Sequence, residues 1–349
     1  MDYGRTLILQ DWYAENDLLN PALFALAELF PQADIGFLKN FETTLPASLA
    51  DRKLSIFAPR FTRKSLDDLG NLIEAEGQIP WQDYDLVVAN TRGYLRHLRR
   101  TLTGNTRFIV YQHDLLPFLW RANPEALNTA AATELLNNQE IDLEFSGGIN
   151  LTIAANFALK NTLSAMLRKD IPLAYPLIDQ SLFFPDPGVA AEYFLATDAA
   201  DVQKLVHLFA CVSDKLVVLG ESQPDKLLRE LKPDNIFYTG KLGVYDQAYY
   251  IAGAKALICG ETKSLSHLPV AALKAGIPLI THPSQGMQEF LADGETGVEL
   301  ETGTEDEILK QVRRYRNEKT DREKIAASVD WLNKEYFLRR MRKAFEKEK

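Results

Sequence analysis

Residues 260–297 read GETKSLSHLPVAALKAGIPLITHPSQGMQEFLADGETG, and short apolar runs precede, interrupt and follow this stretch at 256–259, 278–281 and 298–300. Strand-like runs that alternate with helical segments are typical of parallel strands joined by crossover helices. The stretch therefore predicts an α/β layer with a parallel sheet.

The same alternation extends over most of the chain. Further strand-like runs lie at 6–9, 34–38, 54–58, 86–89, 108–111 and 151–154, and, after a proline-containing stretch at 175–188, at 193–196, 216–219 and 236–238. The two series predict two doubly wound parallel-sheet domains, residues 1–185 and 186–325, followed by a helix over 326–349. Ligands of such sheets bind beyond the carboxyl ends of the strands, so we expect the site in a cleft between the domains.

Composition and charge exclude several classes of protein. The 349 residues suffice for two domains of about 100–200 residues each. The net charge of −9 argues against a nucleic-acid binder, which needs a basic face. Two cysteines, Cys211 and Cys259, cannot build a disulfide framework or a zinc cluster. With no signal-peptide pattern and no apolar run near ~18 residues, we expect a cytoplasmic protein.

The quoted stretch strongly resembles the donor-binding half of GT-B glycosyltransferases, specifically the retaining family 4, also called group 1. The matching residues are Pro269-Val270, Ala272, Ala275-Gly276, Pro278-Leu279-Ile280, Gly286, Glu289, Asp293-Gly294 and Gly297. In the first half, Tyr111-Gln112-His113-Asp114 is similar to a Tyr-x-His loop of the family, and residues 156–157 and 175–185 are similar to the passage that ends its acceptor domain.

The resemblance implies a fold and an activity. The fold is GT-B, with two Rossmann-like domains, and relatives return a C-terminal helix to the N-terminal domain. Trp331, Leu338, Met341 and Phe345 recur at helical spacing in the basic tail, so we expect this apolar stripe to pack there. The activity is hexosyl transfer from a nucleotide-sugar to a glycan or lipid-linked acceptor, without a cofactor or metal. The family histidine beside the sugar and acceptor corresponds to His113.

The donor-site motifs of the family are degenerate in this chain. Two family glutamates correspond to Lys263 and Ala271, and Asp198 stands where relatives place an arginine that neutralises the diphosphate. An acidic group there would repel a diphosphate. The glycine-rich turn that normally follows the first strand is also missing.

Other donor-contact positions keep their place in the sequence. Ser266, His267 and Leu268 fall at the helix start where relatives present backbone amides, and Gly240-Lys241 falls in the loop that contacts the nucleobase. Lys263 and His267 would supply positive charge to an unusual donor. A solvent-facing loop is the simpler interpretation of Lys263, and a plain turn is an equal interpretation of Gly240.

Three functions remain open at this point. The first is a hexosyltransferase of polysaccharide or glycoconjugate assembly. The second is a catalytically inactive scaffold or activating partner of another glycosyltransferase, favoured by the joint loss of donor contacts. The third is an active enzyme with an unusual donor.

Two further clusters carry chemistry in principle. Arg96, Arg99 and Arg100 lie in a basic run that is typical of a solvated helix face. Its functional interpretation is a patch for a lipid-linked acceptor or for the inner face of the membrane. The Asp-x-Asp spacing of Asp83 and Asp85 is that of a metal-diphosphate site, but it precedes a strand, so we expect a turn and a strand start.

Overall fold

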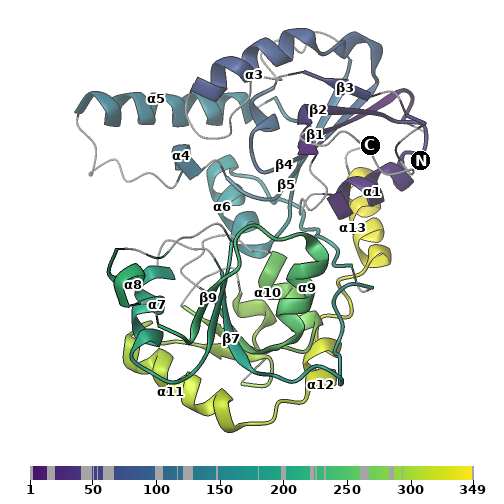
Figure 1. Ribbon diagram of the computed structural model, residues 1–349. Helices are drawn as coiled ribbons and strands as arrows, with labels where there is room; N and C mark the ends of the chain where they lie inside the picture. The colour runs from purple at the N-terminus through teal and green to yellow at the C-terminus, as the bar shows by residue number, and fades with distance from the viewer. Residues whose placement is uncertain are drawn as a thin grey trace. The chain divides into compact units, whose positions relative to one another are not determined.

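The computed structural model describes residues 3–347 except 14–19, 41–48, 50, 53, 58–66, 99–104, 116, 121–128, 147, 180, 198–201, 221–223, 225, 232, 260–266, 283–286 and 293. Backbone contacts divide the chain into two compact units (Figure 1). The first unit consists of Met1–Leu177 and Lys334–Lys349, and the second of Ile178–Asn333. The sequence-based bounds at 185 and 325 each fall eight residues from these crossings.

The first unit is built on a parallel six-stranded sheet in the order β3-β2-β1-β4-β5-β6. Its strands are β1 (Thr6–Tyr13), β2 (Asp34–Asn40), β3 (Leu54–Ile56), β4 (Leu86–Thr91), β5 (Arg107–Gln112) and β6 (Leu151–Ala154). The helices are α1 (Asn20–Leu29), α3 (Asp67–Gln78), α4 (Pro117–Trp120), α5 (Thr129–Ser146) and α6 (Phe157–Leu167), with short 3₁₀ turns η1 (Trp81–Asp83) and η2 (Leu95–His97).

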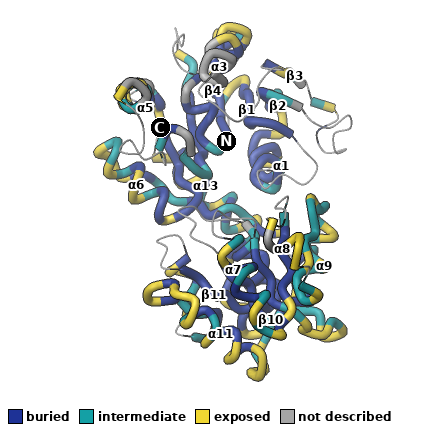
Figure 2. The backbone as a smooth tube through the Cα atoms, turned by 60° about the vertical axis from the view of Figure 1, so that its left-hand side comes forward, coloured by how far each residue is buried: buried dark blue, intermediate teal, exposed yellow. Residues whose placement is uncertain are grey.

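Alternate residues of the central strands enter two separate cores. Ile8 and Val88 pack in one cluster with α1, whereas Leu7 and Val87 pack in another with α3 and η2. Because both faces of the sheet are covered, the central strands β1 and β4 carry apolar runs, at 7–9 and 86–89, before the polar residues Gln10 and Asn90. Figure 2 shows β1 and β4, in the middle of the sheet, as buried throughout.

The second unit repeats this plan with the order β12-β11-β10-β7-β8-β9. Its strands are β7 (Tyr193–Thr197), β8 (Leu216–Leu219), β9 (Ile236–Tyr238), β10 (Ala254–Cys259), β11 (Leu279–Thr281) and β12 (Gly297–Glu299). Its helices are α7 (Val202–Ala210), α8 (Lys226–Leu231), α9 (Val244–Ala252), α10 (His267–Lys274), α11 (Glu305–Asn317) and α12 (Arg322–Ala327), with the turn η4 (Gln288–Phe290). The predicted pair of parallel α/β sheets is confirmed.

The structure explains why two positions of residues 260–297 are occupied by glycine. Gly276 has a φ of 76°, and a Cβ there would lie 2.6 Å from the backbone oxygen of Arg322. Gly297 has a φ of 155°, and its Cβ would lie 2.4 Å from the backbone oxygen of Leu279. Since any side chain would collide with backbone, only glycine fits these two positions.

The last helix, α13 (Lys334–Glu346), belongs to the first unit and lies beside α1 (Figure 1). Phe337, Met341 and Phe345 are fully buried, and Phe345 contacts Phe30 edge to face at 5.5 Å. Trp331 is not part of this stripe, so the predicted stripe is wrong at this position. It precedes α13, remains 39% exposed and stacks on Phe290 of the second unit at 6.2 Å.

Candidate functional site

Polar side chains collect toward the carboxyl ends of β1, β4 and β5, three adjacent strands of the first sheet. The parallel register pairs Gln10 with Asn90, and Asn90 with Tyr111, which is two residues before His113. Gln10 and Asn90 are fully buried, and His113 is partly exposed. The strand ends of a parallel sheet are where α/β proteins bind ligands, so this edge is the first candidate site.

The His113 ring ends a chain of side-chain hydrogen bonds. Its Nε2 lies 2.8 Å from Oδ1 of Asn90, and Nδ2 of Asn90 donates to Oε1 of Gln10 at 2.7 Å. Nε2 of Gln10 donates in turn to Oδ1 of Asn20 at 3.0 Å and to the backbone oxygen of Trp12 at 2.9 Å. A chain of this kind at a buried site fixes the orientation of every member.

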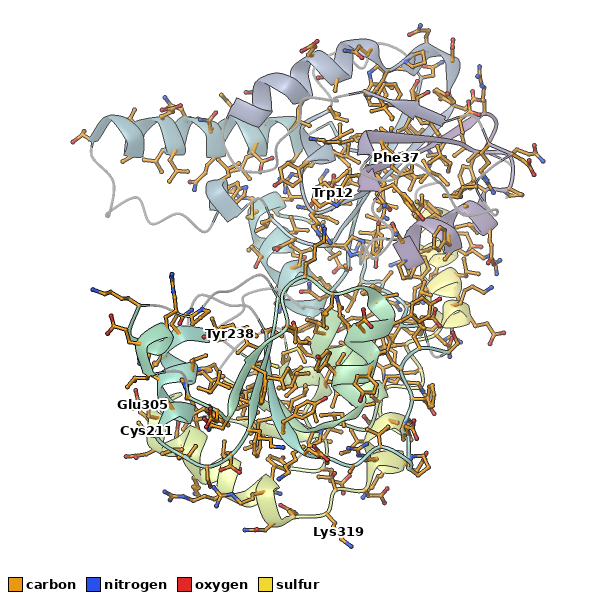
Figure 3. The ribbon with its side chains drawn as sticks, in the orientation of Figure 1. Trp12, Phe37, Cys211, Tyr238, Glu305 and Lys319 are labelled. Carbon is orange, nitrogen blue, oxygen red and sulfur yellow. The ribbon has the colours of Figure 1, made fainter. Side chains whose placement is uncertain are left out.

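Asp11 fixes the loop that follows β4. Its carboxylate accepts from Oγ1 of Thr91 at 2.6 Å and from the backbone nitrogen of Arg92 at 2.6 Å. The guanidinium of Arg92 lies 4.8 Å from the ring centroid of Trp12, which is labelled in Figure 3. These contacts place a positive charge beside the His113 loop.

The surroundings of His113 oppose its protonation. Burial, and after it the charge of Arg92, lowers the pKa of His113 to about 3. The ring of Tyr111 packs edge to face at 4.5 Å, and the backbone nitrogen of His113 donates to the oxygen of Thr91 at 2.8 Å. His113 is therefore a neutral imidazole at physiological pH, able to donate one hydrogen bond and accept one.

Sequence reasoning singled out His113 but missed Gln10, Asn90 and Asp11. The available signal was positional, because Gln10 and Asn90 each follow directly on an apolar run, at 6–9 and 86–89. A polar residue at that point lies at the carboxyl edge of a parallel sheet.

The structure describes part of the expected donor site, which lies in the second unit. Gly240 follows β9 with a φ of 69°, and a Cβ there would meet nothing within 4 Å, so its backbone borders open space. Lys241 is exposed, Leu268 is half-buried in the first turn of α10, and Ala271 is fully buried in the same helix. Asp198, Lys263 and Ser266 lie outside the described residues, as does the side chain of His267, the first residue of α10.

A small cavity of about 20 Å³ lies at the carboxyl ends of β7, β10 and β11. Thr197 and Cys259 line it from the ends of β7 and β10, with Lys204 and Glu305 from the helices, and His282 lines it from the residue after β11. This volume is near that of a single water site. His282 directly follows β11 and is buried.

The surface patch expected around Arg96 is wrong at that residue. Arg96 is 2% exposed, because its Nε lies 3.3 Å from the carboxylate of Asp142 and 2.9 Å from Oγ of Ser146 on α5. Arg99 and Arg100 lie outside the described residues. Asp83 ends η1 and Asp85 directly precedes β4, which confirms the predicted turn and strand start.

The described part of the chain holds neither a membrane-spanning helix nor a metal-ligand cluster. No described helix combines the length and the apolar character needed to cross a membrane. No three described His, Cys, Asp or Glu side chains are grouped as metal ligands would be.

Comparison with solved structures defines the fold class. Sucrose-phosphate synthase from Thermosynechococcus elongatus is 15% identical with a TM-score of 0.72, and 99% of each chain is covered. Anabaena HepE in complex with UDP is 14% identical with a TM-score of 0.70, over 99% of this chain and all of that one. The lipopolysaccharide outer core galactosyltransferase WaaB is 13% identical with a TM-score of 0.65 over the same shares. The predicted GT-B fold is confirmed.

Comparison with protein families points the same way. Residues 201–329 match the family described as glycosyl transferases group 1. A search of the curated proteins found no match. The chain is a GT-B protein like the group 1 glycosyltransferases, as the motifs of residues 260–297 predict.

Proposed function

We propose that this protein transfers a hexosyl residue from a nucleotide-sugar to a hydroxyl of a glycan or lipid-linked acceptor. The observation that carries the proposal is His113, a neutral and partly exposed imidazole held by Asn90 at the carboxyl edge of the first sheet. A side chain whose orientation is fixed before the substrate arrives suits the positioning of a sugar. The resemblance of residues 111–114 to the family's Tyr-x-His loop supports this role, because that histidine lies beside the sugar in the family.

The second unit supplies the nucleotide side of the proposal. HepE, which shares the fold, has been solved with UDP and with UDP-glucose. In this chain, the open backbone at Gly240 and the first turn of α10 would contact the nucleotide. Lys263 and His267 would supply positive charge in place of the arginine that Asp198 replaces.

The proposed reaction breaks the bond between the anomeric carbon and the diphosphate oxygen. The nucleoside diphosphate leaves with the electron pair, and the acceptor oxygen forms the new bond to the same carbon with retained configuration. The proton of the acceptor hydroxyl passes to the departing diphosphate. We propose that no metal ion takes part, so turnover should persist in EDTA.

Release of nucleoside diphosphate from a panel of nucleotide-sugars tests the proposal. The full chain should turn over at least one panel member, and His113→Gln should lower kcat/KM by about tenfold to hundredfold, as expected for a lost substrate hydrogen bond. His207→Gln, on α7 of the second unit, is the matched control and should keep the activity. Equal activity of wild type and His113→Gln would contradict the role of His113.

Ala271 favours a second candidate function, that of an inactive partner of another glycosyltransferase. Its methyl group is fully buried in α10, at the position where relatives carry a glutamate that grips the ribose. A methyl group can form no hydrogen bond to a ribose hydroxyl. This candidate predicts no turnover with any nucleotide-sugar, and it predicts that adding this chain raises the activity of the enzyme it accompanies.

A further inference from the structure

The hydrogen-bond chain that ends at His113 has a direction, and a backbone carbonyl sets it. The oxygen of Trp12 can only accept, so the side-chain atom of Gln10 that lies 2.9 Å away must be the amide nitrogen. The other terminal atom of Gln10 is then the oxygen Oε1. This assignment rests on a group whose polarity cannot be reversed, so it does not depend on how the side-chain amides are oriented beforehand.

The direction passes from Gln10 to His113 through Asn90. Oε1 of Gln10 accepts, so the atom of Asn90 at 2.7 Å must be the nitrogen Nδ2. The remaining atom of Asn90 is therefore the oxygen Oδ1, which lies 2.8 Å from Nε2 of His113. An oxygen acceptor at that distance requires a hydrogen on Nε2, and a neutral ring then carries a lone pair on Nδ1.

Burial makes this direction difficult to reverse. Gln10 and Asn90 are both fully buried, and Asn20, the second acceptor of Gln10, is 4% exposed. Turning either amide would set carbonyl against carbonyl or N–H against N–H in a place that water does not reach. No described residue forms a hydrogen bond with Nδ1 of His113.

We propose that Gln10 and Asn90 are positioning residues that hold His113 as its Nε2–H tautomer, so that Nδ1 accepts a hydrogen bond from a hydroxyl of the transferred sugar. This inference rests on the proposed function for its ligand, whereas the position of the proton follows from the hydrogen bonds alone. The ligand chemistry is specific, because a lone pair selects a group that donates and discriminates against one that only accepts.

Nitrogen-15 NMR of His113 in the full chain reads the proton position without any substrate. In the wild type we expect a protonated Nε2 and an unprotonated Nδ1 from pH 5 to pH 8. A ring that carries its hydrogen on Nδ1, or that is doubly protonated at pH 7, would overturn the inference. Arg92 and Asp114 are the charged groups nearest along these loops, and the same spectra at high salt would show any effect of their charges.

Two variants separate positioning from a purely structural role. Asn90→Leu removes the acceptor of Nε2, and Gln10→Met removes the group that orients Asn90 at a fully buried position. Both should admit the Nδ1–H tautomer and lower kcat/KM, whereas Asn138→Leu, at a partly exposed asparagine of α5, should do neither. If Asn90→Leu does not fold, Gln10→Met alone decides, and an unchanged tautomer in a folded Gln10→Met protein would contradict the positioning role.

A panel of monodeoxy nucleotide-sugars tests the proposed hydrogen bond between a sugar hydroxyl and Nδ1 of His113. Removal of one hydroxyl should lower kcat/KM of the wild type by about tenfold or more, and should lower that of His113→Leu much less, because the shared hydrogen bond is already lost. Equal losses in both proteins at every position would refute the contact. The predicted tautomer in a protein that turns over no nucleotide-sugar would refute the proposed function alone and leave the positioning by Gln10 and Asn90 standing.

Discussion

At the scale of single residues, the titration of His113 makes the unfolding free energy of the protein depend on pH. Its pKa is lowered to about 3 in the folded protein, whereas an unfolded chain has a histidine pKa near 6.5. At a pH between these two pKa values, the unfolded state therefore binds a proton at His113 and the folded state does not. The stability due to this residue is complete above about pH 6.5 and is lost as the pH falls from there toward about 3.

The prediction at this scale compares the wild type with His113→Gln, which keeps a donor for Asn90 but does not titrate. Between pH 7 and pH 5, the wild type should lose about 2 kcal/mol more unfolding free energy than the variant, from about 1.5 pH units of proton linkage. Urea unfolding at the two pH values measures the difference. Parallel losses in the two proteins would show that His113 titrates normally.

At the scale of elements, Arg96 joins η2 to α5. Its ion-pair partner Asp142 is 1% exposed and also accepts from Nε1 of Trp120 at 2.7 Å, which adds α4 to the cluster. Burial lowers the pKa of Arg96, and the charge of Asp142 opposes this effect. A buried pair of this kind is expensive to break on one side, because the remaining charge keeps its desolvation cost.

The prediction at this scale is a loss of about 3–5 kcal/mol of unfolding free energy for Arg96→Met, because the buried Asp142 carboxylate loses its ion-pair partner. The double variant Arg96→Met with Asp142→Leu should recover most of that loss. The exposed pair of Lys324 and Glu295, at 2.6 Å, is the matched control, and Lys324→Met should cost less than about 1 kcal/mol. A double variant no more stable than Arg96→Met would contradict this account.

The strands and helices also show how much of the structure can be predicted from the sequence. Runs predicted at 151–154, 216–219 and 236–238 coincide with β6, β8 and β9, although Phe237 of β9 is 51% exposed. The clearest case is β8, because a strand whose four residues are all buried carries an uninterrupted apolar signal. The partners of Arg96 and His113 carry no such signal. Asn90 is 80 residues from Gln10 and 23 from His113, so the sheet register alone brings them together. Clustering in the sequence suggested an exposed Arg96, but α5 covers it.

At the scale of the whole molecule, the last helix of the chain, α13, packs into the core of the first unit. Phe345 is fully buried against Tyr3 and Phe30, whereas Trp331 remains partly exposed in the second unit. Phe345→Ala should lower the unfolding free energy of the first unit by about 3–5 kcal/mol and leave the second unit unchanged. Trp331 is the only tryptophan of the second unit, so its fluorescence, with the other three replaced by phenylalanine, reports that unit separately.

The outcome that would contradict this arrangement is specific. If the Trp331 signal shifts with Phe345→Ala as much as the first unit does, the two units unfold as one cooperative body. Circular dichroism follows the helices of both units and supplies the transition of the first.

The central claim, a nucleotide-sugar bound by a GT-B glycosyltransferase, is tested most directly by calorimetric titration of the full chain with nucleoside diphosphates and their sugars. The account predicts saturable binding of at least one of them, with about 2.7 kcal/mol of added stability at a hundred times its Kd. Absence of binding by every member of the panel would contradict the claim and leave the inactive partner as the function of this fold.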